Sequence, residues 1–275
     1  MTRACAIEFP MNFFSKAARL INMASFLRTH RQLLLLLFRR DIEARTSGTV
    51  LGGLWMLLQP ALQVAALWFL LDVVLNIRFP GLDGGFVAYF LLGMVPWLML
   101  NEIMQRSLTV MTDYASLYQR ANFPMPLLPL VPWMVSGAIY GATIIVVALL
   151  LAGWQALPGA LILVAGLLVW LLPFCYLLAV IGLFVRDLQQ LAPFILTMFM
   201  YMTPILYVPQ AFPKEFAWWL DVNPFAHLMV LDHALIQGHD WTWLNLSVPV
   251  LLWLLALLPA RRLFLKAAPH MREAL

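Results

Sequence analysis

Five charged residues lie between Arg39 and Arg45, directly before an apolar run that begins at Val50. The chemistry that they offer is ionic: guanidinium groups pair well with phosphate oxygens. Asp41 and Arg45 also have the i, i+4 spacing of an ion pair on one helix. Where a chain enters a bilayer, such charges stay in headgroups or water while the apolar residues enter lipid. We therefore expect a boundary between water and membrane at this cluster.

Imidazole and carboxyl groups that could bind a metal ion gather nearer the C-terminus: His227, Asp232, His233, His239 and Asp240. On one helix, however, His227 and His233 lie about 240° apart around the axis, so they do not share a face. We therefore predict polar residues at a membrane interface here, and no metal site.

Motifs for catalysis or nucleotide binding are absent from the sequence. There is no GxxxxGK[ST] loop, because none of the three lysines, Lys16, Lys214 and Lys266, follows a glycine. HExxH, CxxC and GxSxG are missing as well, and the two cysteines, Cys5 and Cys175, lie far apart. We predict that this chain is not an enzyme and binds no cofactor of its own.

The elements that must position these residues follow from the composition. Hydrophobic residues make up 63% of the 275-residue sequence and charged residues 11%, with a mean hydropathy of +0.87. Such a composition indicates an integral membrane protein. The net charge of +4 comes from basic residues at the ends of apolar runs, which argues against a nucleic-acid surface. The N-terminal residues lack an apolar centre and a cleavage site, so we expect no removable signal peptide.

Six apolar runs are long enough to cross a bilayer. They extend over Val50–Ile77, Phe86–Gln105, Leu127–Gly153, Gly159–Val185, Leu191–Tyr207 and Leu244–Leu265. Few ionisable residues lie within them: Asp72 near the outer end of the first, and Glu102 near the inner end of the second, one turn before Arg106. The lack of midplane charges and of internal repeats argues against a proton- or sodium-coupled transporter.

The basic residues predict the orientation of these spans. An even number of spans places both termini on one side of the membrane. With the termini inside, fifteen of the 17 lysines and arginines are cytoplasmic, and only Arg78 and Lys214 lie outside. We therefore predict a multi-pass protein with both termini in the cytoplasm.

Residues 1–49 form the predicted cytoplasmic N-terminal region, and residues 50–275 form the transmembrane domain. Between Asn12 and Arg28, apolar residues recur at helical spacing with basic and polar residues on the other side. The pattern predicts a basic amphipathic helix that lies flat on the cytoplasmic leaflet. This helix is either an ordinary anchor or also touches a cytosolic partner.

The loop between the second and third spans, residues 106–126, contains a short mixed segment from Asp113 to Asn122. In a helix, one side of this segment would carry Tyr114, Leu117 and Tyr118. Pro124 and Pro126 follow it and end any helix there. The segment could dock into a groove of a cytosolic protein, or it is a surface helix without a partner.

The segment between the fifth and sixth spans, residues 209–243, is too polar to span a membrane and too apolar for a free loop. Asn223 and Pro224 are typical of a helix start and Gly238 of a helix end, which predicts a helix over Phe225–Gln237. Four tryptophans surround it: Trp218, Trp219, Trp241 and Trp243. We expect an external interfacial or re-entrant element.

Five stretches of the sequence are the most distinctive. They are RDIEARTSGTVLGGLWMLLQP (Arg40–Pro60), NFPMPLLPL (Asn122–Leu130), VRDLQQLAPFIL (Val185–Leu196), YMTPILY (Tyr201–Tyr207) and DVNPF (Asp221–Phe225). In order and spacing they resemble the ABC-2 type permeases that export O-antigen, capsular polysaccharide and teichoic acid. The resemblance covers most of the chain from about Arg39 to Phe225 and includes the six-span layout.

The resemblance implies an all-α, homodimeric transmembrane subunit of a bacterial inner-membrane exporter. It would pair with two copies of a separate P-loop ATPase, which would bind the ATP and Mg²⁺, and the missing P-loop is then expected. Its cargo would be a polyprenol-linked polysaccharide such as O-antigen. The N-terminal helix and a coupling segment would contact the ATPase, the latter through Asp113, Tyr114, Leu117, Tyr118, Arg120 and Phe123. Residues 209–243 would close the exit.

A glycan is polar but has apolar C–H faces, so aromatic side chains could hold it loosely enough to slide. The candidates for such a path are Trp55, Trp68, Trp97, Trp133, Tyr140 and Tyr201. Aromatic residues of membrane proteins also serve as interface anchors or packing. Likewise Arg39, Arg40 and Arg45 either attract the pyrophosphate of the substrate as a gate or act only as anchors.

Two other functions stay open from the sequence. One is an ABC-2 exporter of drugs or lipids. The other, from a different class, is a multispan enzyme acting on lipid-linked sugars, which would need clustered carboxylates and has only Asp41, Glu43 and Asp187 to offer. A stable ATPase partner would distinguish an exporter from such an enzyme.

Overall fold

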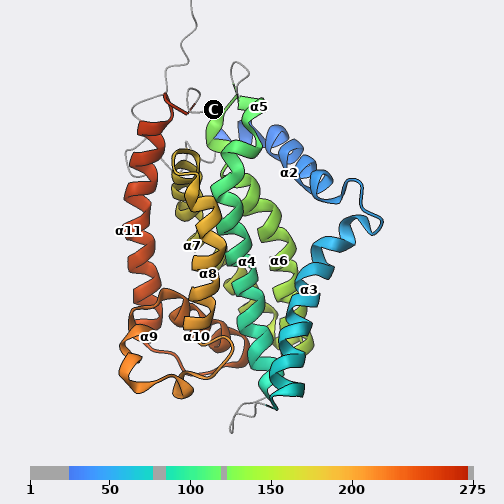
Figure 1. Cartoon of the computed structure of the whole chain (residues 1–275), viewed down its shortest axis with the longest axis vertical. Coiled ribbons are helices and arrows are strands. Elements are labelled where there is room, and N and C mark those ends of the chain that lie inside the picture. The colour runs from blue at the N-terminus through green and yellow to red at the C-terminus, as the bar shows by residue number, and fades with distance from the viewer. Residues whose placement is uncertain (1–24, 77–84, 119–122, 272–275) are drawn as a thin grey trace, which may run out of the picture.

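The computed structural model describes residues 25–76, 85–118 and 123–271, and every regular element within them is a helix. The long helices run side by side along the molecule (Figure 1). Their bounds are α3 Trp55–Trp68, α4 Gly85–Asp113, α6 Leu130–Ala152, α7 Leu157–Phe184, α8 Asp187–Met202 and α11 Trp243–Ala267. At one end α2, Arg31–Thr46, lies across the bundle, and at the other end lies α10, Pro224–Gln237. The predicted all-helical fold is confirmed for the described residues.

Five of the six predicted spans are confirmed as helices long and apolar enough to cross a membrane. They are Gly52–Val74, Gly85–Asp113, Met125–Ala152, Trp154–Phe184 and Trp243–Ala267. The predicted fifth span, Leu191–Tyr207, falls on α8, which has only 16 residues and ends in extended backbone at Thr203. At 1.5 Å per residue α8 is about 24 Å long, less than a hydrocarbon layer of roughly 30 Å. The six-span count therefore stays a prediction.

α4 forms the centre of the bundle, because it packs against α6, α7 and α8 and most of its apolar side chains are buried. Trp97 of α4 and Trp170 of α7 both meet Phe225 of α10 edge to face, with ring centroids 5.4 and 5.7 Å apart. Each aromatic pair of this kind contributes about 0.5–1.5 kcal/mol beyond burial. The first turn of α10 is thereby anchored in the core.

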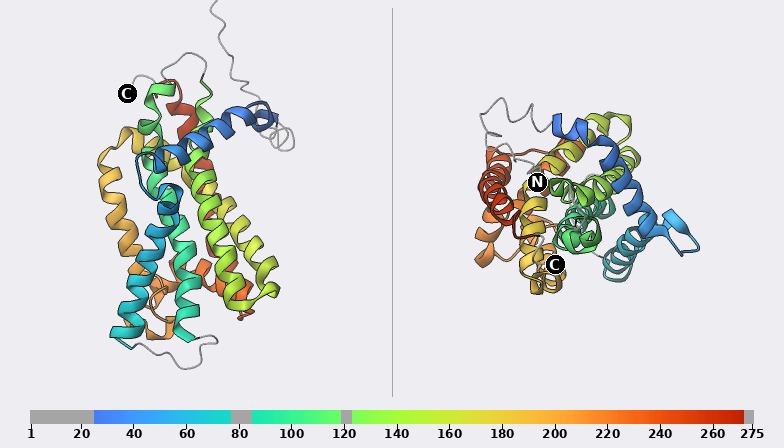
Figure 2. Two further views of the ribbon diagram at one scale, coloured as in Figure 1. Left: turned by 90° about the vertical axis from the view of Figure 1, so that its right-hand side faces the viewer. Right: turned by 90° about the horizontal axis from the view of Figure 1, so that it is seen from above.

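α3 lies along the side of the bundle, whereas α2 lies across its end (Figure 2). A 3-10 turn, Gly52–Leu54, precedes α3, and a π-helical turn, Phe69–Val74, follows it. Only 6% of the apolar window of this span is buried inside the chain. On α8 the buried residues form a single stripe of Ala192, Leu196 and Met200. Both helices therefore present apolar surface to lipid or to another chain.

α6 and α7 approach closely where α6 has small residues. Gly137 and Gly141 lie one turn apart and face Leu168 and Val164 of α7. This is the small-xxx-small spacing of packed membrane helices, in which the missing side chains let the backbones come together. The indole N–H of Trp133 also donates to the Leu168 carbonyl oxygen at 2.7 Å. The two helices thus form one packed unit beside α4.

The predicted helix between the fifth and sixth spans is confirmed as α10. The Asn223 side chain accepts a hydrogen bond from the Phe225 N–H at 3.0 Å, and Gly238 ends the helix with a φ of +74°. The Asn223 amide also donates to the Thr203 hydroxyl at 3.0 Å. One capping residue therefore starts α10 and ties it to the end of α8.

The predicted amphipathic helix between Asn12 and Arg28 lies largely outside the described residues. α2 follows it and buries Leu34, Leu37 and Asp41, which recur at helical spacing on the side that faces the bundle. A carboxylate in such an apolar stripe requires partners, and it leads to the candidate site.

Candidate functional site

Asp41 is only 3% exposed and accepts hydrogen bonds from three donors. Its Oδ1 accepts from Arg106 Nη2 at 2.7 Å and from the Tyr114 hydroxyl at 3.0 Å, and its Oδ2 accepts from Arg45 Nε at 2.9 Å. The predicted pair of Asp41 and Arg45 is thereby confirmed. A buried carboxylate is tolerated when it is paired and hydrogen-bonded in this way.

Arg45 extends these contacts to α4 and α6. Its Nη1 lies 3.3 Å from Glu102 Oε1, and its Nη2 donates to Ser136 Oγ at 3.2 Å. Arg106 lies 3.9 Å from the same Glu102 oxygen. Burial, and then the charge of Arg106, lower the pKa of Arg45, whereas Asp41 and Glu102 raise it; an arginine still stays charged. We call Asp41, Arg45, Glu102 and Arg106 the charge network.

Tyr114 connects the charge network to the predicted coupling segment. The residue is buried, and burial, followed by the charge on Asp41, raises the pKa of its phenol, so the hydroxyl stays protonated and donates. The Arg40 guanidinium carbon lies 5.4 Å from the centre of the Tyr114 ring, within range of a cation–π contact. The short helix α5, Ala115–Tyr118, begins directly after this anchor.

The coupling segment differs from its prediction, because α4 continues as far as Asp113 and α5 has only four residues. The predicted coupling residues lie as follows: Asp113 is exposed, Leu117 and Phe123 are half-buried, Tyr114 is buried, and Arg120 and the side chain of Tyr118 lie outside the described residues. Tyr114 is thus bound within the chain. A role in coupling stays a prediction for all six.

The three arginines predicted as a substrate gate fall into two kinds. Arg45 is bound to two carboxylates and a hydroxyl, whereas Arg39 and Arg40 are exposed on α2. An anion could reach Arg39 and Arg40 directly, but it would have to displace ion pairs to reach Arg45. The structure therefore separates two accessible cations from one that holds helices together.

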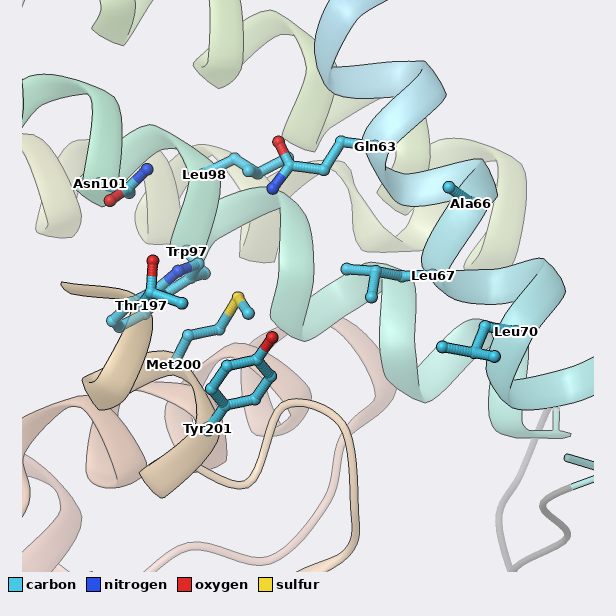
Figure 3. Close-up of a pocket in the computed structure, with 10 residues that line it drawn as sticks. All are labelled: Gln63, Ala66, Leu67, Leu70, Trp97, Leu98, Asn101, Thr197, Met200 and Tyr201. Carbon is cyan, nitrogen blue, oxygen red and sulfur yellow. The ribbon is translucent and has the colours of Figure 1, made fainter. Parts of the chain in front are cut away.

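A groove of about 380 Å³ lies between α3, α4 and α8 (Figure 3). Its walls are Gln63, Ala66, Leu67 and Leu70 from α3, Trp97, Leu98 and Asn101 from α4, and Thr197, Met200 and Tyr201 from α8. Gln63 extends from α3 toward α4, and the Tyr201 ring extends from α8 toward the same space. Four of its ten lining residues carry an amide or a hydroxyl group, so the walls are mixed rather than mainly apolar.

Of the six aromatic residues predicted for a glycan path, only Trp97 and Tyr201 line this groove. Trp55 and Trp68 are exposed on the side of the bundle, and Tyr140 is half-buried in α6. Trp133 makes the α6–α7 contact described above, which fits packing. The path role stays a prediction for each of them.

Three polar residues of the groove were not predicted: Gln63, Asn101 and Thr197. Their signal in the sequence is an amide or hydroxyl inside an apolar run, since lipid-facing positions favour apolar side chains. That signal marks candidates but does not place them on one surface, because the residues come from three helices.

His227, Asp232 and His233 are buried in the protein, His239 is half-buried and Asp240 is exposed. The burial arises because α10 is packed against α4, α7 and α11, so that more than one of its sides is covered. A place at the membrane interface stays a prediction for these residues. His227 Nε2 donates to the Asp221 carbonyl oxygen at 2.8 Å, and its Nδ1 accepts from the Asn245 amide at 3.0 Å. Within the described ranges no three ligating side chains are grouped to hold a metal ion.

Comparison with known proteins gives the family. An O-antigen export system permease protein RfbA from Klebsiella pneumoniae is 24% identical over 222 residues, which are 78% of this chain and 84% of the relative. RfbA from Myxococcus xanthus is 27% identical over 227 residues, or 80% and 86% of the two chains. The polysialic acid transport protein KpsM from Escherichia coli is 24% identical over 217 residues, or 74% and 81%. Residues 32–231, which contain the charge network and the groove, match the ABC-2 type transporter family, and the chain belongs to that family.

Proposed function

We propose that this chain is the permease subunit of an ATP-driven exporter that moves a polyprenol-linked polysaccharide, such as O-antigen, across the bacterial inner membrane. The family match over residues 32–231 carries the proposal. The named relatives narrow it, because they are permease or transport proteins for O-antigen and polysialic acid.

In the proposed topology, α8 and the residues after it complete a sixth crossing, and both termini are cytoplasmic. The basic residues support this orientation, and the tryptophans support a membrane interface at the opposite end. α4, α7 and α11 terminate at the end of the bundle with α2 and α5, which we call the basic end (Figure 1). α2 contains Arg39, and the last turns of these helices or the residues just after them contain Arg106, Arg186, Arg262 and Lys266, as expected for a cytoplasmic side. Exposed tryptophans toward the other end, Trp154, Trp218, Trp241 and Trp243, are typical of a membrane interface. There α10 would form the external re-entrant element.

The energy source would be a separate P-loop ATPase, present in two copies and binding ATP with Mg²⁺. Its closure on ATP would press on the basic end of the permease, where the charge network and Tyr114 join α2, α4 and α5. Joined elements move together, so a push on α5 would be passed to α4 and α2. The conformational change of the permease would follow from this motion.

A second copy of the chain would cover the apolar sides of α3 and α8. These helices flank the groove, and both expose large hydrophobic residues, among them Leu57, Leu62, Phe194 and Met198. Lipid alone could solvate these side chains, but a homodimer would also enclose the groove between two copies. The proposed glycan path would then pass Tyr201, with Gln63 and Asn101 as hydrogen-bonding groups and with Trp97, only 2% exposed, as part of the wall behind them.

The exposed arginines of α2 give a test of the substrate gate. Replacement of both Arg39 and Arg40 by glutamine is expected to lower export of lipid-linked glycan about tenfold, the loss of a charge-assisted contact to phosphate. The amount of the membrane protein should not change, and its melting temperature should fall by at most about 2–4 °C, because Arg40 also lies over the Tyr114 ring. Arg45→Gln should lower the melting temperature further, because it breaks the charge network.

Arg31→Gln is the matched control, since Arg31 is an exposed arginine at the start of the same helix. The readout is surface polysaccharide in cells in which the variant replaces the native chain, normalised to the amount of the chain in the membrane. Export at the normal rate by the double variant would rule out a gate at Arg39 and Arg40.

The proposed function as a whole is tested by purification of the tagged chain from its native host in mild detergent. We expect a stoichiometric P-loop ATPase to copurify, and we expect ATP hydrolysis that rises when the isolated polyprenol-linked glycan is added. If an ATPase copurifies but its activity is stimulated by drugs or lipids and not by the glycan, the family assignment stands and the proposed cargo is wrong. If no ATPase is present in an intact preparation, the proposal that the chain is part of an exporter is wrong.

A further inference from the structure

α10 contains a buried carboxyl group that has no hydrogen-bond partner among the residues that the structure describes. Asp232 is 0% exposed, and neither of its carboxyl oxygens has a hydrogen-bond partner in the part of the chain that the structure describes. The adjacent residue, His233, is also buried, and its Nε2 is likewise unpartnered there. Most buried polar groups of folded proteins are hydrogen-bonded, and each exception requires a physical explanation.

Asp232 lies in an apolar stripe of α10. Its spacing of three, four and seven residues from Met229, Ile236 and Phe225 places it on the same side of the helix. These three residues are buried, and Met229 lies against Gly93 of α4. A carboxyl group therefore stands where the packing of the helix would suit an apolar side chain.

No cation on the neighbouring elements can pair with Asp232. α10 packs against α4, α6, α7, α9 (Trp218–Val222), α11 and the turn Trp154–Ala156. The titratable groups of these elements near α10 are Tyr89 and Asp221, with His227 and His239 on the α10 segment itself. On α4 and α7 the remaining ones, Glu102, Arg106, Asp113, Cys175 and Tyr176, lie beyond Trp97 and Trp170, which contact Phe225 at the far end of α10. On α11 they are Arg261, Arg262 and Lys266, at least 16 residues after Asn245, which bonds His227, and on α6 the one such group is Tyr140, near the middle of that helix. Among the described residues, Asp232 thus has no lysine or arginine beside it.

His233 cannot supply the missing charge either. Its ring stacks on Tyr89 of α4 at a centroid distance of 4.5 Å and an interplanar angle of 6°, and His239 lies 6.1 Å away. Burial, opposed by Gln237 and assisted by His239, lowers the pKa of His233 to about 4, so the imidazole is neutral near pH 7. The Tyr89 hydroxyl donates to the carbonyl oxygens of Pro204 and Tyr207 at 2.7 and 3.1 Å. This stack joins α10, α4 and the segment after α8.

We infer that Asp232 is a proton-binding site that keeps α10 packed against the bundle while its carboxyl group is neutral and releases the helix when the group ionises. A carboxylate in this apolar stripe would require water, and water can reach it only if α10 moves away from α4, α7 and α11. Burial raises the pKa of Asp232 well above its usual range, in agreement with a neutral group. Since it concerns protons at α10, the inference holds whatever the cargo is.

The stability of the folded chain depends on pH because the folded and unfolded states bind protons to Asp232 with different affinities. The pKa of Asp232 is higher in the folded state than in the unfolded state, where it is about 3.9. The folded state therefore holds one more proton between these two values, and stability falls as the pH rises through that window. His233, with its lowered pKa, acts in the opposite sense and matters only as the pH falls below about 6.5 toward 4.

The test compares thermal unfolding of the purified wild-type chain and of Asp232→Asn in detergent from about pH 5 to about pH 8. Asparagine keeps the shape and cannot ionise, so the melting temperature of the variant minus that of the wild type should increase by about 3 °C per pH unit. Asp221→Asn, which removes an exposed carboxyl group from α9, should leave the wild-type slope unchanged. A constant difference, or one that falls with pH as for a carboxylate paired with a cation, would overturn the inference.

Hydrogen exchange at α10 provides a second measurement that also covers release of the helix. At about pH 8, peptides from Pro224–Gln237 should exchange faster in the wild type than in Asp232→Asn, and at about pH 5 the two should agree. Peptides from α6 should show no difference at either pH. If the asparagine variant does not fold, infrared spectra of the wild type test the protonation of the carboxyl group instead. The inference requires a band of a protonated carboxylic acid that disappears as the pH is raised. Absence of this band at about pH 5 would contradict the inference.

Discussion

Replacement of Gly182 by alanine is expected to lower the stability of the bundle by at least about 3 kcal/mol, the upper end for overpacking. Gly182 lies in α7 where it crosses α4, and a Cβ there would overlap the backbone of Leu108, including its carbonyl oxygen. Backbone atoms inside a helix cannot turn aside as a side chain can. Gln189 Nε2 donates to the carbonyl oxygens of Gly182 and Leu108 at 2.9 and 3.2 Å. Separation of the two helices would therefore also loosen α8.

The measurement is thermal unfolding of the purified chain in detergent, followed by tryptophan fluorescence. Gly166→Ala is the matched control, because Gly166 lies in the same helix, is exposed and has open space where a Cβ would be added. At such a position alanine favours the helix by about 0.5–1 kcal/mol. The two variants should thus shift the melting temperature in opposite directions. Unfolding of Gly182→Ala at the wild-type temperature would show that α7 and α4 are farther apart than the structure places them.

The sequence predicted most of the membrane helices because a bilayer imposes length and apolarity together. It predicted their ends less well. α8 stops at Met202 although the apolar run continues to Tyr207, since Thr203 takes up extended backbone and binds Asn223. α4 continues to Asp113, well past the predicted Gln105, because polar residues of its last turns have partners within the chain, such as Asp41 for Arg106. The ends of α8 and α4 thus depend on contacts between elements, and the hydrophobicity of the sequence does not predict such contacts.

In the candidate site, too, contacts between different helices could not be predicted from the sequence. Asp41 and Arg45 were predicted to pair from their spacing on one helix, and they do. The bonds from Arg45 to Glu102 and from Tyr114 to Asp41 join residues 57 and 73 positions apart, and no local spacing rule predicts them. The ends of α10 followed from capping chemistry, whereas the burial of Asp232 depends on three helices around it. Interactions within one helix could therefore be predicted from the sequence, whereas contacts between residues of different helices could not.

Asp41→Asn is expected to destabilise the chain by about 3 kcal/mol, because removal of one partner leaves buried charge uncompensated. The substitution keeps the size of the side chain, and it removes the charge that Arg45 and Arg106 share. This loss of stability lies at the lower end of the range for broken buried pairs. The reason is that Arg45 still contacts Glu102 and Ser136 and that both arginines are partly exposed. Tyr114 also loses its charged acceptor, so the anchor of α5 on α2 weakens.

Glu43→Gln is the matched control, because it removes one negative charge from an exposed position on the same helix and should leave stability unchanged. The expected fall in melting temperature for Asp41→Asn is on the order of 10 °C. A double-mutant cycle with Arg106→Gln separates pairing from general damage: if the two groups stabilise each other across α2 and α4, the double variant is more stable than the sum of the single losses predicts, by about 0.5–3 kcal/mol. Additive losses would mean that Asp41 and Arg106 contribute independently, and this pair would then not join α2 to α4, leaving that role to Arg45 and Glu102.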